Sequence, residues 1–313
     1  MSEATSEQIF GNWNFTDQDL NPYLQDWKPV LPKKDTPLKF SPERQQIFDR
    51  IIVESSNDIG KYIPHAAPNE QTHFFILPGF DQQVGNQLID GGEYLGKFGQ
   101  KHYITLRLPN NKVESSEPFT PEEEEALRIA IQHELLHQAH AERIGQMQFF
   151  KSDYSNLPNG NELSFEEIMS LKDQRPSNKS KGGASIFSAV TEGAATLGEL
   201  YLVGKRIEEM RQSGDTLRAS LLEKLKADRL KYLVNALRIY HIDPKMSSHM
   251  FGGPYAIGVI KLMHGLYKKY GIESIVDIIQ KIDLDKCRNI RAEDSEFGRI
   301  CADPSLLPGL ENK

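Results

Sequence analysis

Residues 120–145, TPEEEEALRIAIQHELLHQAHAERIG, decide the fold of this chain. Thr120 is a suitable N-cap and Glu123 completes a capping box with it, while a proline occupies the first helical position between them. Gly145 is a suitable residue for the end of the helix. We therefore predict a long helix that begins after Thr120 and runs to about Ile144.

The centre of this predicted helix carries His133-Glu134-Leu135-Leu136-His137, an HExxH motif of the kind found in zinc metalloproteases. At about 100° per residue the two histidines lie roughly 40° apart on one face and about 6 Å apart along the axis, so both reach one ion. Glu134 lies on the flank of that face, where it acts as a general base toward water. The alternative is a surface helix that carries polar residues, but the aliphatic surroundings would make unpaired polar groups costly.

The two histidines leave a catalytic zinc site incomplete, because such a site usually has three protein ligands. In metzincins the HExxH motif is followed by a glycine and a third histidine. This chain has His140 and Arg143 at those positions, so it lacks the metzincin motif. His140 shares the ligand face, but one straight helix does not offer three tetrahedral positions, so we interpret it as a neighbour of the ligands. The best candidate for the third ligand is Glu192, which small residues follow.

Three motifs, in this order, resemble the gluzincins related to aminopeptidase N. They are the HExxH motif, Glu192-Gly193 with Glu199 seven residues after Glu192, and Pro254-Tyr255-Ala256-Ile257-Gly258. The resemblance covers about residues 100 to 282. The resemblance implies a zincin-like fold, with Glu192 as third ligand and Tyr255 as hydrogen-bond donor to the transition-state oxyanion. Glu199 would orient a ligand imidazole or begin a solvated helix face. Tyr255 has the alternative of a core aromatic.

The chain departs from that family in two places. Between His137 and Glu192 lie 54 residues, far more than the family has, and we expect residues 146–185 to form a mobile cover of the cleft. The family's GxMEN strand, whose acid binds the substrate's free amine, has no counterpart, and Gly91-Gly92-Glu93 is its nearest echo. Its absence favours internal cleavage of peptides or proteins.

We predict an α+β fold, zincin-like and of the gluzincin type, with the cleft between a small sheet and a mainly helical part. Residues 1–118 form the mixed part and residues 119–313 the helical part of one continuous catalytic unit. Glycines between the two strongest strand patterns predict turns. The expected helices are Ser41–Glu54, Phe165–Leu171, Ile186–Arg211, Thr216–Tyr240, Tyr255–Tyr270 and Glu273–Ile282, and the expected strands His73–Leu77 and His102–Leu108.

The composition limits the choice of partners. The 313 residues have a formal net charge of -7, which provides no basic field for nucleic acid or an anionic membrane. No secretory signal or membrane span is visible, so we expect a cytoplasmic protein, although export by a specialised route would leave the same pattern. Cys287 and Cys301 are expected to be ordinary thiols.

These observations together predict a Zn²⁺-dependent metallopeptidase whose partner is a peptide or protein substrate. His133, His137 and Glu192 would hold the metal, with Glu134 as general base. Two alternatives stay open: a binding protein that kept the fold and lost turnover, and a zinc hydrolase that acts on a substrate other than a peptide.

Overall fold

The computed structural model describes residues 36–79, 91–113, 115–145, 154, 163–173, 185–242, 262–291 and 294–310. In these residues the predicted α+β class is confirmed, because one three-stranded sheet is accompanied by a mostly helical remainder. The chain divides into two compact units. The sheet unit draws its described residues from Pro22–Lys61 and Ala67–Ser177, and the helical unit draws them from Tyr62–Ala66 and Asn178–Lys313.

The sheet has the strand order β1-β3-β2, in which β1 (Thr72–Pro78) pairs parallel with β3 (Lys101–Leu108) and β2 (Gly91–Phe98) pairs antiparallel with β3. Both predicted strands are therefore confirmed. The prediction of turns throughout the glycine-rich stretch was wrong for β2. Tyr94, Leu95 and Phe98 are buried there, and their burial outweighs the low strand preference of glycine.

One face of the sheet is covered by α2 (Pro42–Tyr62) and α4 (Pro121–Ile144). Phe48 of α2 lies edge-on against Phe74 of β1, with ring centroids 5.8 Å apart. Arg128 of α4 pairs with Glu54 and Asp58 of α2, which links the two helices. The helix α2 includes the predicted segment and extends beyond it.

The helix α4 matches its prediction at both ends. Thr120 accepts a hydrogen bond from the backbone N–H of Glu123, and the Glu123 side chain accepts one from the backbone N–H of Thr120, which completes the capping box. Gly145 ends the helix with a positive φ of 85°. The helix α4 belongs to the sheet unit. The sequence pattern instead places it in the helical part that begins at residue 119.

The opposite face of the sheet packs against α6 (Phe165–Asp173), a helix of the segment expected to be a mobile cover. Tyr154 also belongs to this layer, because its ring stacks on that of Phe98 at 5.1 Å. The predicted helix Phe165–Leu171 is confirmed as α6, and it contributes to the core. Most of residues 146–185, including Arg175–Gly183, lie outside the described residues, so the mobile cover stays a prediction. The buried core residues are Phe75, Leu77, Leu95, Phe98, Tyr103, Phe165 and Ile168.

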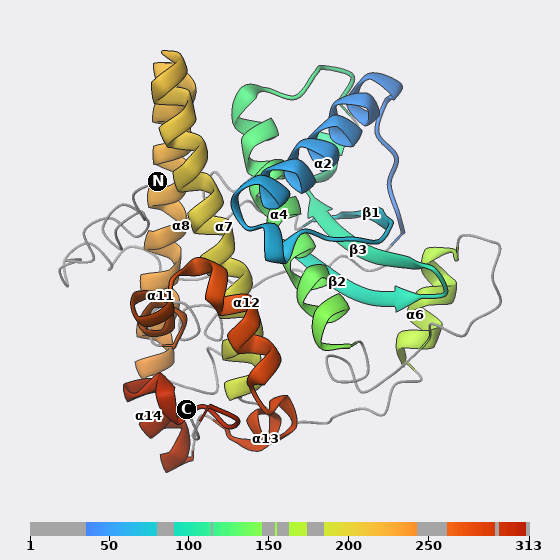
Figure 1. Cartoon of the computed structure of the whole chain (residues 1–313). Helices are drawn as coiled ribbons and strands as arrows, with labels where there is room; N and C mark the ends of the chain where they lie inside the picture. The colour runs from blue at the N-terminus through green and yellow to red at the C-terminus, as the bar shows by residue number, and fades with distance from the viewer. Residues whose placement is uncertain are drawn as a thin grey trace. The chain divides into compact units, whose positions relative to one another are not determined.

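The helical unit is built on α7 (Ile186–Ser213) and α8 (Thr216–Ile242), which confirm two predicted helices and lie side by side as a long hairpin (Figure 1). Ser185 caps α7 through its side chain, and Gly214 ends it in the left-handed conformation at φ 82°. Buried alanines and glycines in the first half of α7 allow close packing of that helix.

Shorter helices complete the described part of the helical unit. The predicted helices near residues 264 and 273 are found as α11 (His264–Tyr270) and α12 (Ile272–Lys281), while residues 251–261 lie outside the described part. Across both units, three short helices and two 3-10 turns were not predicted from the sequence, and α3 is the one of them that lies in the sheet unit. They are α3 (Asn110–Val113), α13 (Leu284–Asn289), α14 (Ser295–Ala302), η2 (Pro64–Ala66) and η4 (Pro304–Leu306).

Cys287 and Cys301 are not joined by a disulfide in this structure. Burial raises the pKa of the Cys287 thiol to about 12, so this group is a packing residue at neutral pH. Among the helices of the described residues, none has the length and apolar character needed to cross a membrane.

Candidate active site

The HExxH residues lie on the buried side of α4. His133, Glu134 and His137 are 5%, 4% and 6% exposed, respectively. A polar group at this depth requires a partner, since burying it unpaired is costly. The helix therefore presents three chemically active side chains within two turns, in surroundings that exclude bulk water.

The two histidines turn the same ring nitrogen toward each other. His133 Nε2 and His137 Nε2 are 3.2 Å apart, and the ring planes are inclined by 79°. Two imidazole nitrogens on one tetrahedral zinc, each at 2.0–2.1 Å, would be about 3.3–3.4 Å apart. The observed spacing fits such an ion closely. A hydrogen bond between the two rings is the other arrangement that this distance permits.

A polar network fixes α4 against the start of the sheet. Gln138, which follows His137, is fully buried. Its Oε1 accepts a hydrogen bond from Thr72 Oγ1 at 2.6 Å, and its Nε2 donates to Glu142 Oε1 at 2.7 Å and to the backbone carbonyl of Glu70 at 3.1 Å. These bonds oppose rotation and sliding of the helix, so they help to hold the direction of the two imidazoles.

His102 of β3 joins the same network at its other side. Its Nδ1 lies 2.6 Å from the Tyr94 hydroxyl, and its Nε2 lies 3.0 Å from a Glu70 oxygen and 3.6 Å from Glu142 Oε1. Burial lowers the pKa of His102, although Glu142 and Glu70 oppose this effect and Lys97 adds to it. The imidazole is therefore held mainly in its neutral form near pH 7, able to accept from the hydroxyl and donate to a carboxylate.

Glu134 is pressed against the edge strand β2. A Cβ placed on Gly92 would lie 2.5 Å from Glu134 Oε1 and 2.9 Å from both Cδ and Cγ. The glutamate thus occupies the space that a side chain at residue 92 would fill. The sequence did not predict this contact, because Gly92 and Glu134 are far apart in the chain.

Glu93 points away from Glu134. In a strand successive side chains alternate between the faces, so Glu93 lies on the face of α6 while Gly92 lies on the face of α4. Its carboxylate pairs there with Lys172 of α6. Glu93, the residue nearest in pattern to the family's amine-binding acid, therefore lies on the face of the sheet opposite Glu134 and does not fit that role.

The third predicted ligand, Glu192, lies on α7 in the helical unit and is half-buried. Among the described residues, His133, His137 and Glu192 offer donor atoms of the kinds that could hold a metal ion. The joining of Glu192 with the two histidines of the sheet unit in one site stays a prediction. One carboxylate and two imidazoles is a donor set found in catalytic zinc sites. The chemistry of the three side chains therefore fits zinc.

Glu199 is 1% exposed, so its alternative as the start of a solvated helix face was wrong. Its two carboxylate oxygens accept hydrogen bonds from Arg229 of α8, at 2.9 Å from Nε and 3.1 Å from Nη2. This forked pair fixes the carboxylate in a buried position. Orientation of a ligand imidazole by Glu199 stays a prediction.

Two further predicted residues complete the set. His140 is buried, and its ring centroid lies 6.5 Å from that of His137, which places it beside the two histidines of the HExxH motif. Tyr255, predicted as oxyanion donor, lies outside the described residues. Its role stays a prediction from the sequence.

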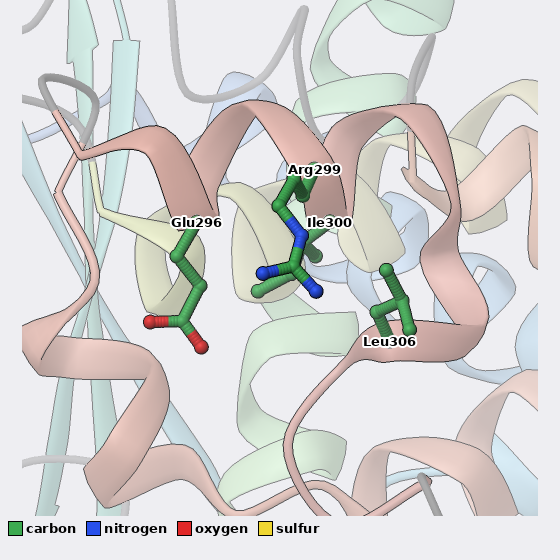
Figure 2. Close-up of a pocket in the computed structure, with 4 residues that line it drawn as sticks. All are labelled: Glu296, Arg299, Ile300 and Leu306. Carbon is green, nitrogen blue, oxygen red and sulfur yellow. The ribbon is translucent and has the colours of Figure 1, made fainter.

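A small hollow in the C-terminal part of the chain is a weaker candidate for a functional site. It has a volume of about 190 Å³ and is formed by α14 and η4, where Glu296 and Arg299 reach into it beside two aliphatic side chains (Figure 2). Small-molecule sites usually measure about 300–1,000 Å³. Its other lining residues are Ile300 and Leu306.

Comparison of the chain with protein-family models, curated proteins and solved structures finds no match in any of the three. The gluzincin resemblance therefore depends on the motifs alone.

Proposed function

We propose that this chain is a zinc metallopeptidase with a zincin-like fold of the gluzincin type. The observation that carries the proposal is the 3.2 Å separation of the His133 and His137 Nε2 atoms on a buried helix face. A capped helix, a rigid polar network around Gln138 and the neighbouring Glu134 support it. The donor set with Glu192 supports it further.

His133, His137 and Glu192 would hold the ion. When bound, zinc supplies a Lewis acid that polarises a carbonyl and lowers the pKa of a water. Glu134 accepts the proton of the attacking water on a carboxylate oxygen and later gives it to the nitrogen of the leaving amine. The hydroxyl of Tyr255 donates a hydrogen bond to the oxyanion of the substrate.

We propose internal cleavage rather than removal of single N-terminal residues. On β2, the positions facing α4 near Glu134 are Gly92 and Tyr94, and neither carries an acid. Glu93 is engaged by Lys172 on the opposite face. The described part of this strand therefore offers no carboxylate to a free substrate amine.

The test is digestion of a broad peptide library by the wild type, Glu134→Gln and Glu166→Gln, with zinc supplied and cleavage products identified by mass spectrometry. Glu166 is an exposed glutamate of α6, so its variant controls for the loss of one carboxylate. We expect internal cuts by the wild type and the control and none by Glu134→Gln. Equal cleavage by all three would exclude the proposed base.

The same experiment separates the alternatives. A wild type that binds zinc but cuts no peptide would favour an inactive binding protein or a hydrolase of another substrate. Release of single residues only from unblocked peptides would show that the enzyme is an aminopeptidase and that the internal-cleavage proposal is wrong.

A further inference from the structure

The edge strand β2 touches the proposed general base at one point, Gly92. Three atoms of the Glu134 side chain lie within 3 Å of the position of a Cβ on this glycine, namely Oε1 at 2.5 Å and Cδ and Cγ at 2.9 Å. Real side chains do not approach so closely. Alanine at residue 92 would therefore displace Glu134, the strand, or both.

The backbone does not require glycine at this position. Gly92 lies in the regular ladder opposite Leu106 and is absent from the glycines with positive φ, whereas its neighbour Gly91 has a φ of 154° and open space around it. Glycine within a strand is unfavourable because it gains flexibility in the unfolded chain. The close approach of Glu134 is thus the physical reason for glycine at residue 92.

The contact restricts a side chain that would otherwise be adaptable. A glutamate has several accessible rotamers, and ordering it costs free energy. The strand backbone on one side and the helix on the other leave its carboxylate in a narrow space. A base held in this way is already near the place where it must accept a proton, which is the basis of catalytic preorganisation.

We propose that Gly92 is a positioning residue, whose missing side chain forms the space that holds the Glu134 carboxylate in its working orientation. The inference rests on the proposed function for the role of Glu134. The steric relation between the two residues does not depend on that function and is tested separately.

The first test is a double-mutant cycle on metal-free protein, with thermal unfolding as the readout. Gly92→Ala should lower Tm by roughly 2–10 °C if the carboxylate stays in place, since overpacking of this kind is destabilising. In the Glu134→Ala background all three contacting atoms are absent, and Gly92→Ala should leave Tm unchanged. Gly298→Ala is the control for an added Cβ without crowding, because a Cβ there meets nothing within 4 Å. Since Gly298 lies in the helix α14, this change should raise Tm slightly and should not lower it.

The second test covers the case in which the carboxylate swings away and Tm is preserved. In metal-free protein labelled with ¹³Cδ-glutamate, the Glu134 resonance is identified by its loss in Glu134→Gln. Gly92→Ala should shift this resonance, and Gly298→Ala should not. With zinc and a cleavable peptide, Gly92→Ala should also lower kcat by more than tenfold with little change in KM or zinc content.

The proposal is overturned if Gly92→Ala changes neither Tm nor the Glu134 resonance. It is equally overturned if Gly92→Ala lowers Tm by the same amount in both backgrounds without moving the resonance, because Gly92 would then serve only the strand. If the wild type cuts no peptide, the proposed function fails while the cycle and the resonance still report on the contact.

Discussion

Replacement of His137 by alanine should abolish stabilisation of the chain by zinc. The Nε2 atoms of His133 and His137 are 3.2 Å apart, and a tetrahedral zinc requires about 3.3–3.4 Å. The two ligands therefore need to move by only about 0.1–0.2 Å. Little binding energy is used to rearrange the helix, so zinc binding should appear almost fully as added stability.

The magnitude follows from mass action. A ligand at 100 times its Kd stabilises the folded state by about 2.7 kcal/mol, which corresponds to a rise in Tm on the order of 5–10 °C for a protein of this size class. His137→Ala removes one of the three ligands. At the same free zinc concentration its Tm should stay within about 1 °C of the metal-free value.

The assay is thermal unfolding followed by circular dichroism, in a zinc buffer and in chelator. Glu134→Gln should keep the full shift, because the proposed function makes Glu134 a base and not a ligand. His65→Ala, which removes an exposed histidine of η2, controls for zinc bound at the surface. A wild type without a zinc-dependent shift, or an equal shift in His137→Ala, would refute the site.

Four other outcomes are expected. Burial lowers the pKa of Lys226 from 10.5 to about 8, so the unfolded chain binds more protons than the folded chain between pH 8 and pH 10.5. The free energy of unfolding should therefore rise with pH across that window. In denaturant unfolding at pH 7, Lys226→Met should raise the free energy of unfolding by about 1–2 kcal/mol, after allowance for the partial exposure of the side chain. Burial also lowers the pKa of His102, so the contribution of this residue to the free energy of unfolding is present above pH 6.5 and is lost as the pH falls below it. His102→Gln should therefore weaken the loss of stability toward acid pH in a plot of unfolding free energy against pH. Ile168→Ala should cost about 2–4 kcal/mol of unfolding free energy while leaving zinc content unchanged, since it opens a cavity in the α6 layer. Tyr255→Phe should lower kcat on the order of 100-fold without loss of zinc, and unchanged kinetics would remove Tyr255 from the mechanism.

The helix α4 was predictable because its signals are local. Thr120 and Glu123 form the capping box that their spacing indicates, and Gly145 ends the helix. The two histidines meet because four residues make slightly more than one turn. Each of these relations joins residues close in sequence, so a helical period is enough to derive them.

The strand β2 and the packing of the helix α6 show what the sequence patterns did not predict. Gly91 and Gly92 suggested a turn, but Tyr94 and Leu95, which follow them, are buried, and their burial favours a strand in the sheet. The helix α6 lies in a segment whose polar and glycine-rich ends suggested a cover, and its buried Phe165 and Ile168 gave too short an apolar pattern to indicate a core. Long-range packing outweighed local composition in both cases.

The helix α4 combines two functions that sequence patterns describe separately. His133 and His137 are one turn apart on one face, while Glu134 and Gln138, each one residue later, form the next face. That second face contacts the sheet at two places, with Glu134 against Gly92 and Gln138 bonded to the start of β1. Because the sheet holds the second face, the rotation of the helix is set, and with it the direction in which both imidazoles point. The HExxH motif and the residues that align it are therefore neighbours on one helix, and only their partners on the sheet could not be predicted from the sequence.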